Sequence, residues 1–247
     1  TQSNNYVEFN NMCWRIVRIE GDTSVKITLA AQKKCNEITD SDTGTAFIGT
    51  GNYGYTYDYV TNSEGKASND KKYIAEFLNS TENTTSMKYN LDNWLTNSGI
   101  DTSKLKKDVW CLGNTTNAYD LDGKLLSSTV NDLMFSSTST YYDTYIRLYG
   151  KGVATTATLK CDGSNYETYE SYIGTLTADE VVFAGGTVEA NNSNYYLTDN
   201  ATSGWWWTLS PSNFNINEDV VFNVNNIGGI SYNSVNDNGN MRPVVSL

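Results

Sequence analysis

The C-terminal part of the chain, residues 205–247, encloses a polar stretch between two apolar segments. The first segment, Trp205–Pro211, begins with three consecutive tryptophans, and the second, Met241–Leu247, closes the chain. Residues 213–238 between them are rich in Asn, Ser, Gly and Asp. Apolar segments of this length suit core strands, whereas the polar residues suit exposed turns. The pattern predicts two core strands that hold an exposed polar surface, and it favours a binding protein over an enzyme.

The polar stretch also carries aromatic side chains among its amides. In protein-binding loops, Tyr supplies contact area while Asn and Ser supply adaptable hydrogen bonds. We therefore expect a ligand to contact the following residues: Asn213, Phe214, Asn215, Asn217, Asn223, Asn225, Asn226, Tyr232, Asn233, Asn236, Asp237 and Asn238. The alternative is that these residues form only solvated turns, because Asn and Gly are common turn residues.

The three consecutive tryptophans leave a similar choice open. Alternate strand residues point to opposite faces, so Trp205 and Trp207 should share one face and Trp206 should take the other. If exposed, they would form a stacking platform for sugar rings or peptides. Because aromatic side chains dominate protein cores, we expect at least two of the three to be buried. The same burial is expected of Trp14, Trp94 and Trp110.

The chain has no histidine, which excludes imidazole bases, Ser-His-Asp triads and His-ligated zinc sites. Catalysis would have to use carboxylates, Tyr, Lys or Cys. The acidic groups at Asp40–Asp42 and Asp120–Gly123 do not follow the twelve-residue calcium loop with its closing Glu. We expect no metal, no cofactor and no enzymatic activity. A carboxylate pair of the glycosidase type stays open, because the spacing that matters there is spatial.

The formal net charge of −11 limits the partners of the chain. Nucleic acid and anionic membrane surfaces both require a basic face, so neither is an expected partner. No segment approaches the roughly 20 apolar residues of a membrane span, so direct membrane insertion is not expected either. Because the chain begins at Thr1 just before an expected strand, we interpret it as a processed extracellular segment, either secreted or anchored at a bacterial cell surface.

Four cysteines are present, and none belongs to a C-x-x-C motif. Three pairings are conceivable, and we favour Cys13–Cys35 and Cys111–Cys161. Disulfides would place the chain in an oxidising compartment, and each would stabilise it by about 2–4 kcal/mol. Four buried free thiols are the alternative.

Period-2 hydrophobic patterns and turn residues predict mostly strands. Strands are expected at 6–19 (with an Asn10-Asn11 turn), 24–31, 109–112, 205–209, 220–224, 227–232 and 241–247, and an extended segment at 141–148. Helices are expected at 71–78, at 87–96 after a Ser86 cap, and at 177–184 after a Thr177 cap. Residues 36–69 are expected to form a long ordered loop. This composition predicts a single α+β domain over 1–247, with its first and last strands paired.

Several motifs together resemble a family of extracellular domains from Gram-positive, gut-type bacteria. They are Asn5–Ile19, Leu91–Trp94, Thr177–Gly186, and the Trp-Trp-Thr-Leu-Ser-Pro and Met-Arg-Pro-Val segments of the C-terminus. The ending is also similar to the C-type-lectin-like fold of formylglycine-generating enzymes and of the variable proteins of diversity-generating retroelements. That resemblance implies mixed antiparallel sheets with two to three short helices, and a polar insert at 213–238 that faces the ligand.

The chain departs from both groups in ways that remove known activities. Formylglycine-generating enzymes use a cysteine pair near the C-terminal strands to bind copper, but no cysteine follows Cys161. Calcium-dependent lectins use proline-containing sugar-binding motifs, which the surroundings of Pro211 and Pro243 do not match. The resemblance therefore implies a C-type-lectin-like recognition domain of an adhesin or surface protein, with a protein or glycan ligand. The alternative is a structural pilin or other filament subunit that self-assembles as a homo-oligomer.

One charged residue, Arg242, interrupts the apolar terminal segment. We expect it to form a buried ion pair with Glu218 or Asp219 that fixes the last strand, rather than to bind an anion.

Overall fold

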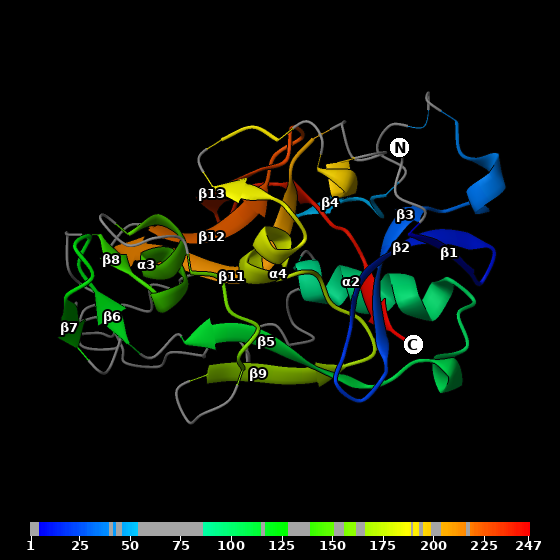
Figure 1. Ribbon diagram of the computed structural model, residues 1–247, viewed down its shortest axis with the longest axis horizontal. Coiled ribbons are helices and arrows are strands. Elements are labelled where there is room, and N and C mark those ends of the chain that lie inside the picture. The colour runs from blue at the N-terminus through cyan, green and yellow to red at the C-terminus, as the bar shows by residue number, and fades with distance from the viewer. Residues whose placement is uncertain are drawn as a thin grey trace, which may run out of the picture.

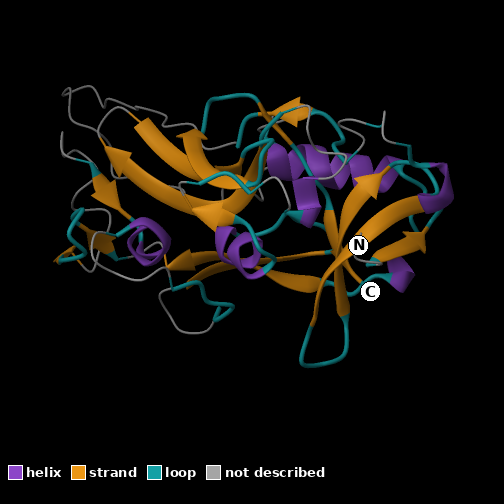
Figure 2. Cartoon of the chain, turned by 45° about the horizontal axis from the view of Figure 1, so that its top comes forward, coloured by secondary structure: helices purple, strands orange, loops and turns teal. Residues whose placement is uncertain are grey.

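The computed structural model has an α+β architecture in which strands predominate (Figure 2). It describes residues 5–39, 42, 46–53, 86–114, 117–127, 139–150, 156–161, 166–188, 190–192, 195–198, 204–215 and 218–247. The α+β class expected from the sequence is confirmed. The helix expected at 71–78 and most of the loop expected at 36–69 lie outside the described residues.

Within the described residues, the strands form three sheets. The first sheet has the order β1 (Tyr6–Phe9), β2 (Met12–Ile19), β3 (Val25–Ala31), β15 (Val244–Ser246). The large sheet has the order β10 (Thr187–Val188), β13 (Gly229–Ser234), β12 (Glu218–Val224), β11 (Trp206–Asn215), β8 (Thr140–Tyr141), β6 (Ala118–Tyr119), β7 (Leu125–Ser127), and β14 (Gly239–Asn240) joins β11 to β4 (Thr50–Gly51). A two-stranded ribbon pairs β5 (Asp108–Asn114) with β9 (Tyr166–Ser171).

The sheets are arranged along the long axis of the molecule. Figure 1 shows β1, β2 and β3 at one end, β6, β7 and β8 at the other, and the β5–β9 ribbon running beneath the large sheet. The helices α3 (Asp143–Tyr149) and α4 (Ala178–Phe183) lie beside β11, and α2 (Met87–Asn97) lies near β2 and β3. Short 3-10 helices occur at Cys35–Glu37, Thr102–Lys104 and Tyr196–Thr198.

The N-terminal hairpin follows the expected pattern. Asn10 and Asn11 both have positive φ, 52° and 56°, the conformation that a two-residue turn between twisted strands requires. β1 and β2 are therefore paired in register from Tyr6↔Arg15 to Phe9↔Met12.

The last strand pairs with β3 rather than with the first strand, which corrects the pairing expected from the sequence. Val245 of β15 lies opposite Ile27 of β3, and both residues are fully buried. β1 and β3 each have one edge that β2 does not use. β3 is buried along almost its whole length whereas β1 is partly exposed, so the buried strand β15 pairs with β3. The C-terminus still belongs to the N-terminal sheet.

Two of the three α-helices in the described part of the chain have the caps expected from the sequence. Ser86 accepts a hydrogen bond from Tyr89 N at the start of α2. Thr177 and Glu180 form a reciprocal capping box at the start of α4.

The third helix, α3, was expected to be extended, and that prediction is wrong. Tyr145 and Tyr149 are four residues apart, so one face of α3 stacks them with a centroid separation of 5.3 Å. Tyr141 of β8 lies four residues before Tyr145, and its ring centroid is 4.3 Å from that of Tyr145. Asp143 and Arg147 form an ion pair at the same spacing. Aromatic residues favour strands on average, but here the four-residue period outweighs that preference.

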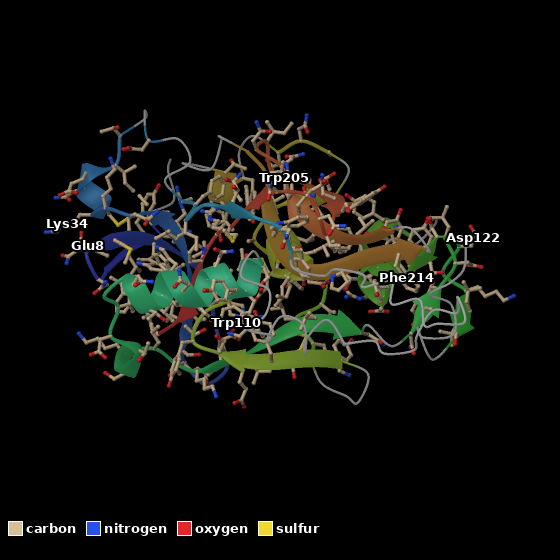
Figure 3. All side chains as sticks on the ribbon, turned by 180° about the vertical axis from the view of Figure 1, so that it is seen from behind. Glu8, Lys34, Trp110, Asp122, Trp205 and Phe214 are labelled. Carbon is tan, nitrogen blue, oxygen red and sulfur yellow. A yellow bond between two sulfur atoms is a disulfide. The ribbon has the colours of Figure 1, made fainter. Side chains whose placement is uncertain are left out.

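The core contains most of the tryptophans. Trp206 and Trp207 are fully buried, while Trp205 is partly exposed and packs edge-on against Trp207 at 4.7 Å. This confirms that at least two of the three are buried and that Trp205 and Trp207 share a face. Trp14 and Trp110 are also buried, whereas Trp94 is only partly buried against the core. The stick view places Trp110 within the body of the molecule and Asp122 at its outer end (Figure 3).

Both expected disulfides are present, and the described cysteines include no free thiol. Cys13–Cys35 ties β2 to the 3-10 helix after β3, and Cys111–Cys161 ties β5 to the segment 156–161. No helix in the described part of the chain combines the length and apolar character needed to cross a membrane.

Arg242 is buried between backbone carbonyls. Its Nε donates to Leu29 O at 3.0 Å, its Nη1 donates to Leu197 O, and its guanidinium lies 5.1 Å from the centroid of the Trp206 ring. The side chains of Glu218 and Asp219, its expected partners, lie outside the described part of the structure, so that ion pair stays a prediction.

Candidate functional site

The expected contact residues do not form one surface. Alternate strand residues point to opposite sides of the sheet. The pairs Phe222↔Tyr232 and Asn223↔Ser231 therefore place Tyr232 on one face of β12–β13 and the neighbouring Asn233 on the other. The predicted surface is divided between both faces and both ends of the hairpin.

Two of the expected contact residues belong to the interior, which corrects the sequence prediction. Phe214 has no exposed surface and packs against Tyr142 with the ring centroids 5.2 Å apart. Asn223 is 1 % exposed, and its amide donates to the Asn233 side chain at 2.7 Å. Strand alternation places both residues toward packed neighbours, so neither can contact a ligand.

Asn225 forms the tight turn between β12 and β13. Its side-chain oxygen accepts hydrogen bonds from the backbone of Ile227 and Gly229 at 3.0 and 2.8 Å. This bonding is what the alternative prediction, in which these residues form only solvated turns, leads one to expect of Asn225. Asn226 is exposed beside it. This turn is separated from the Val220↔Ser234 pair by about 17 Å, the length of five strand residues.

At the other end of β13, the polar side chains form hydrogen bonds with one another. Asn233 bridges Asn223 and Asp237, to whose carboxylate it donates at 2.9 Å. Asn236, Asp237 and Asn238 are exposed in the following turn. The side chain of Asn215 and the whole of Asn217 lie outside the described residues.

On the opposite face, five aromatic side chains form a tyrosine cluster. Its members are Tyr141, Tyr145, Tyr149, Phe222 and Tyr232. Phe222 and Tyr145 are buried, and Tyr149 donates a hydrogen bond to Ile230 O. Tyr232 is the most exposed member at 43 %. The cluster is therefore a rigid aromatic layer with one ring presented to solvent.

Polar groups border the exposed side of the tyrosine cluster. Asn213 of β11 lies opposite Tyr141 on the neighbouring strand β8 and opposite Val220 on the other neighbour, β12. Val220 in turn lies opposite Ser234 of β13. These residues share the sheet face of Tyr232, and Asn213 and Ser234 are both partly exposed. Burial and the neighbouring Tyr232 raise the pKa of Tyr141, so its hydroxyl stays protonated at neutral pH.

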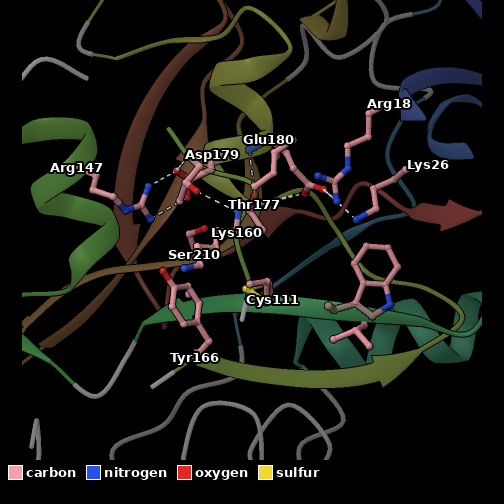
Figure 4. A pocket seen from close by; sticks show the side chains of 16 residues that line it. Arg18, Lys26, Cys111, Arg147, Lys160, Tyr166, Thr177, Asp179, Glu180 and Ser210 are labelled. Carbon is pink, nitrogen blue, oxygen red and sulfur yellow. Dashed lines mark hydrogen bonds and ion pairs between the residues drawn. A yellow bond between two sulfur atoms is a disulfide. The ribbon is translucent and has the colours of Figure 1, made fainter. Parts of the chain in front are cut away.

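The second feature is a small charged pocket, drawn in Figure 4, between the β5–β9 ribbon and the start of α4. Its volume is about 60 Å³. Arg147 and Asp179 lie on one side, and Glu180, Arg18 and Lys26 lie on the other (Figure 4). The Cys111–Cys161 disulfide forms part of its wall.

The two ion clusters of the pocket are closely bonded. Arg147 donates to both oxygens of Asp179 and to Asp143. Glu180 accepts from Lys26 at 2.9 Å and lies 3.2 Å from Arg18. Burial opposes ionisation of Glu180, but Lys26, Arg18 and the Thr177 backbone N–H together hold its pKa below the ordinary value.

The sequence indicated part of these features. Tyr232 and Asn213 were among the expected contact residues, and both lie on the face of the tyrosine cluster. Tyr141 of β8 and the two tyrosines of α3, Tyr145 and Tyr149, were missed, although their four-residue spacing was a usable signal. The pocket was missed because its residues come from segments far apart in the chain. Among the described residues, no group of three or more Cys, Asp or Glu side chains could hold a metal ion.

Comparison with known proteins gave no relationship. No protein-family model, no curated protein sequence and no solved structure matches the chain.

Proposed function

We propose that this chain is an extracellular recognition domain, secreted or anchored at a bacterial cell surface, that binds a protein or glycan ligand and has no enzymatic activity. The contact surface is the exposed side of the tyrosine cluster with the polar groups that border it. The observation that carries the proposal is Tyr232, which is 43 % exposed although its ring rests on a buried aromatic layer.

A preorganised aromatic surface is suited to recognition. Tyr149 and Phe222 hold Tyr232 edge-on, at centroid separations of 5.9 and 6.4 Å, so little side-chain freedom remains to be lost on binding. The amide of Asn213 and the hydroxyl of Ser234 offer hydrogen bonds on the same face. A ring face with flanking amides can stack on a sugar or on a peptide side chain.

The two disulfides support the extracellular location, because such bonds persist in oxidising compartments. The C-type-lectin-like relationship remains part of the proposal. It is supported by the aromatic strand β11 and by β15, which follows Arg242-Pro243 at the C-terminus.

The test is equilibrium binding to arrays of glycans and of displayed peptides, with Tyr232→Ser beside the wild type. We expect Tyr232→Ser to weaken the strongest array ligand by about 30-fold, the effect of losing one central hot-spot side chain. The matched control is Ile227→Ser at the far end of the hairpin, where a residue of similar exposure (39 %) is changed.

Both variants should keep the thermal midpoint of the wild type within a few degrees, because each change is at a partly exposed position. Equal affinities of Tyr232→Ser and wild type for every array ligand would refute the tyrosine cluster as the contact surface.

A specific observation also favours self-assembly as a second candidate function. Within the described residues, β7 is the last strand in the order of the large sheet, and its Leu125 and Leu126 are 49 % and 46 % exposed. An exposed apolar edge strand is a template for pairing with another chain. Filaments in sedimentation and electron microscopy that disappear on Leu126→Lys would support this function.

A further inference from the structure

The charged pocket holds unused hydrogen-bond donors. Lys26 is 4 % exposed, and its ammonium makes one hydrogen bond, to Glu180. Its other carboxylate contacts, to Glu20 at 3.8 Å and Asp108 at 4.0 Å, are too long to be hydrogen bonds. An ammonium has three N–H donors, so two of them have no oxygen or nitrogen acceptor within the described residues, although the ammonium also lies 4.8 Å from the centroid of the Trp110 ring.

A second lining residue is in the same situation. Arg18 directs Nη2 toward Glu20 and Glu180, at 2.7 and 3.2 Å. Its Nε is buried and has no hydrogen-bond partner in the part of the chain that the structure describes. Buried donors are almost always paired in folded proteins, so this donor requires an acceptor, which a water molecule or a ligand atom can supply.

The side chains of the lining indicate the kind of acceptor. Four cationic side chains line the pocket, those of Arg18, Lys26, Arg147 and Lys160, against two carboxylates, Asp179 and Glu180. Three further carboxylates, Glu20, Asp108 and Asp143, contact the same cations from outside the lining, so the excess of positive charge is confined to the lining itself. The donors of Lys26 and Arg18, rather than a net charge, favour an anionic acceptor, because hydrogen bonds between ionised partners are the strong ones.

The volume of the pocket and the apolar residues at its opening limit the ligand further. A cavity of about 60 Å³ has room for about four water molecules, or for a carboxylate and its adjoining carbons. Two exposed apolar residues also line it, Val109 at 51 % and Leu159 at 45 % exposure. A fitting ligand carries a negative head with an apolar group next to it.

We propose that this pocket binds a small apolar carboxylate, whose oxygens accept hydrogen bonds from Lys26 and Arg18 while its apolar group lies against Val109 and Leu159. Free carboxylic acids and the C-terminal carboxylate of a peptide share this chemistry. The site is separate from the tyrosine cluster, and the inference does not depend on the proposed function.

The test is a titration followed by ¹⁵N NMR, with N-acetyl-L-leucine as the mimic of a peptide C-terminus and valerate as the free acid. We expect saturable shifts at the amides of Gly113 and Thr158, which line the pocket, with dissociation constants of about 1–10 mM for such small ligands. Tighter binding of one probe identifies the source of the carboxylate. The neutral analogue N-acetyl-L-leucinamide should bind at least about tenfold more weakly, because it lacks the charge-assisted hydrogen bonds.

Variants separate the pocket from general charge effects. Arg18→Gln should weaken N-acetyl-L-leucine about tenfold, since it removes one cationic donor. Lys107→Gln removes an exposed cation that does not line the pocket and should leave the affinity unchanged.

Leu159→Ser tests the apolar contact. It should weaken binding of N-acetyl-L-leucine but not of acetate, which has no apolar group to place against Leu159. Tyr232→Ser should bind the probe as the wild type does, so failure of this site and failure of the proposed function are distinguishable.

Several results would overturn the proposal. They are the absence of saturable shifts up to about 50 mM probe, well above the expected constants, equal binding of the neutral amide, and an equal loss in Arg18→Gln and Lys107→Gln. A thermal midpoint is measured for each variant, and Lys160→Gln, which changes an exposed lining residue, replaces Arg18→Gln if that variant does not fold.

Discussion

At the scale of single residues, Glu180 has two structural roles. Its carboxylate accepts from the backbone of Thr177, which completes the cap of α4, and from Lys26 of β3, which lies 154 positions away in the chain. One buried side chain thereby joins the start of a helix to the N-terminal sheet. Such a charge is tolerated only because its partners are held in place around it.

Replacing this residue should therefore be costly. We expect Glu180→Gln to lower the free energy of unfolding by about 3 kcal/mol, because Lys26 would remain buried without its charged partner. Urea unfolding at neutral pH measures the change. A loss below about 1 kcal/mol, as at exposed ion pairs, would contradict this assignment.

The same residue gives the stability a pH dependence of known sign. The pKa of Glu180 is lower in the folded protein than its ordinary value of 4.5, so the unfolded chain binds the proton first as the pH falls. Its contribution is complete above about pH 5.5 and decreases as the pH falls through 4.5 toward the folded pKa. Between pH 6 and pH 3, the wild type should lose more stability than Glu180→Gln, and equal losses would exclude Glu180 as a source of the dependence.

At the scale of elements, the β5–β9 ribbon depends on close approach and on covalent attachment. Gly174, just after β9, lies against the Trp110 ring so closely that a Cβ there would be 2.4 Å from ring carbon. The Cys111–Cys161 disulfide joins β5 to the segment 156–161, which also bonds to α4 through Thr158 N and Asp179. The ribbon is thereby attached to the pocket wall.

The two disulfides should contribute unequally to stability. Cys111–Cys161 closes a loop with a sequence separation of 50 and Cys13–Cys35 one of 22, so loop entropy predicts contributions of about 4 and 3 kcal/mol. We expect Cys111→Ser with Cys161→Ser to lower the urea midpoint more than Cys13→Ser with Cys35→Ser. The opposite order would show that native packing around Cys13, which is fully buried, outweighs loop length.

Local patterns in the sequence were sufficient for elements that depend on neighbouring residues. The Asn10-Asn11 hairpin, the caps at Ser86 and Thr177, and the burial of Trp206 all follow from near neighbours. The helix α3 was missed because aromatic composition was weighted above spacing. The β15–β3 pairing was missed because edge occupancy within a sheet is a property of the whole fold.

At the scale of the whole molecule, strand alternation explains why the candidate site was predicted only in part. The polar stretch 213–238 reads as continuous along the chain, but its residues are divided between two faces, two turns and the interior. Asn213 and Tyr232 remain together because cross-strand register places them on one face. Their aromatic support comes from α3, and no local pattern near Tyr232 could have indicated it.

The charged pocket illustrates the same limit for long-range contacts. Its lining comes from β2, β3, β5, β9, α3, α4, β11 and the segment 156–161. No spacing within one element indicates such a site, and the acidic net charge of the chain even argues against a cation-rich pocket.

The central claim is that ligands are recognised on the face of Tyr232, and amide chemical-shift mapping with the strongest array ligand tests it most directly. We predict that the largest shifts fall on Asn213, Tyr141, Tyr232 and Ser234, while the turn at 225–228 stays unchanged. Shifts centred on that turn, or on Asn236–Asn238 with none at Tyr232, would contradict the account.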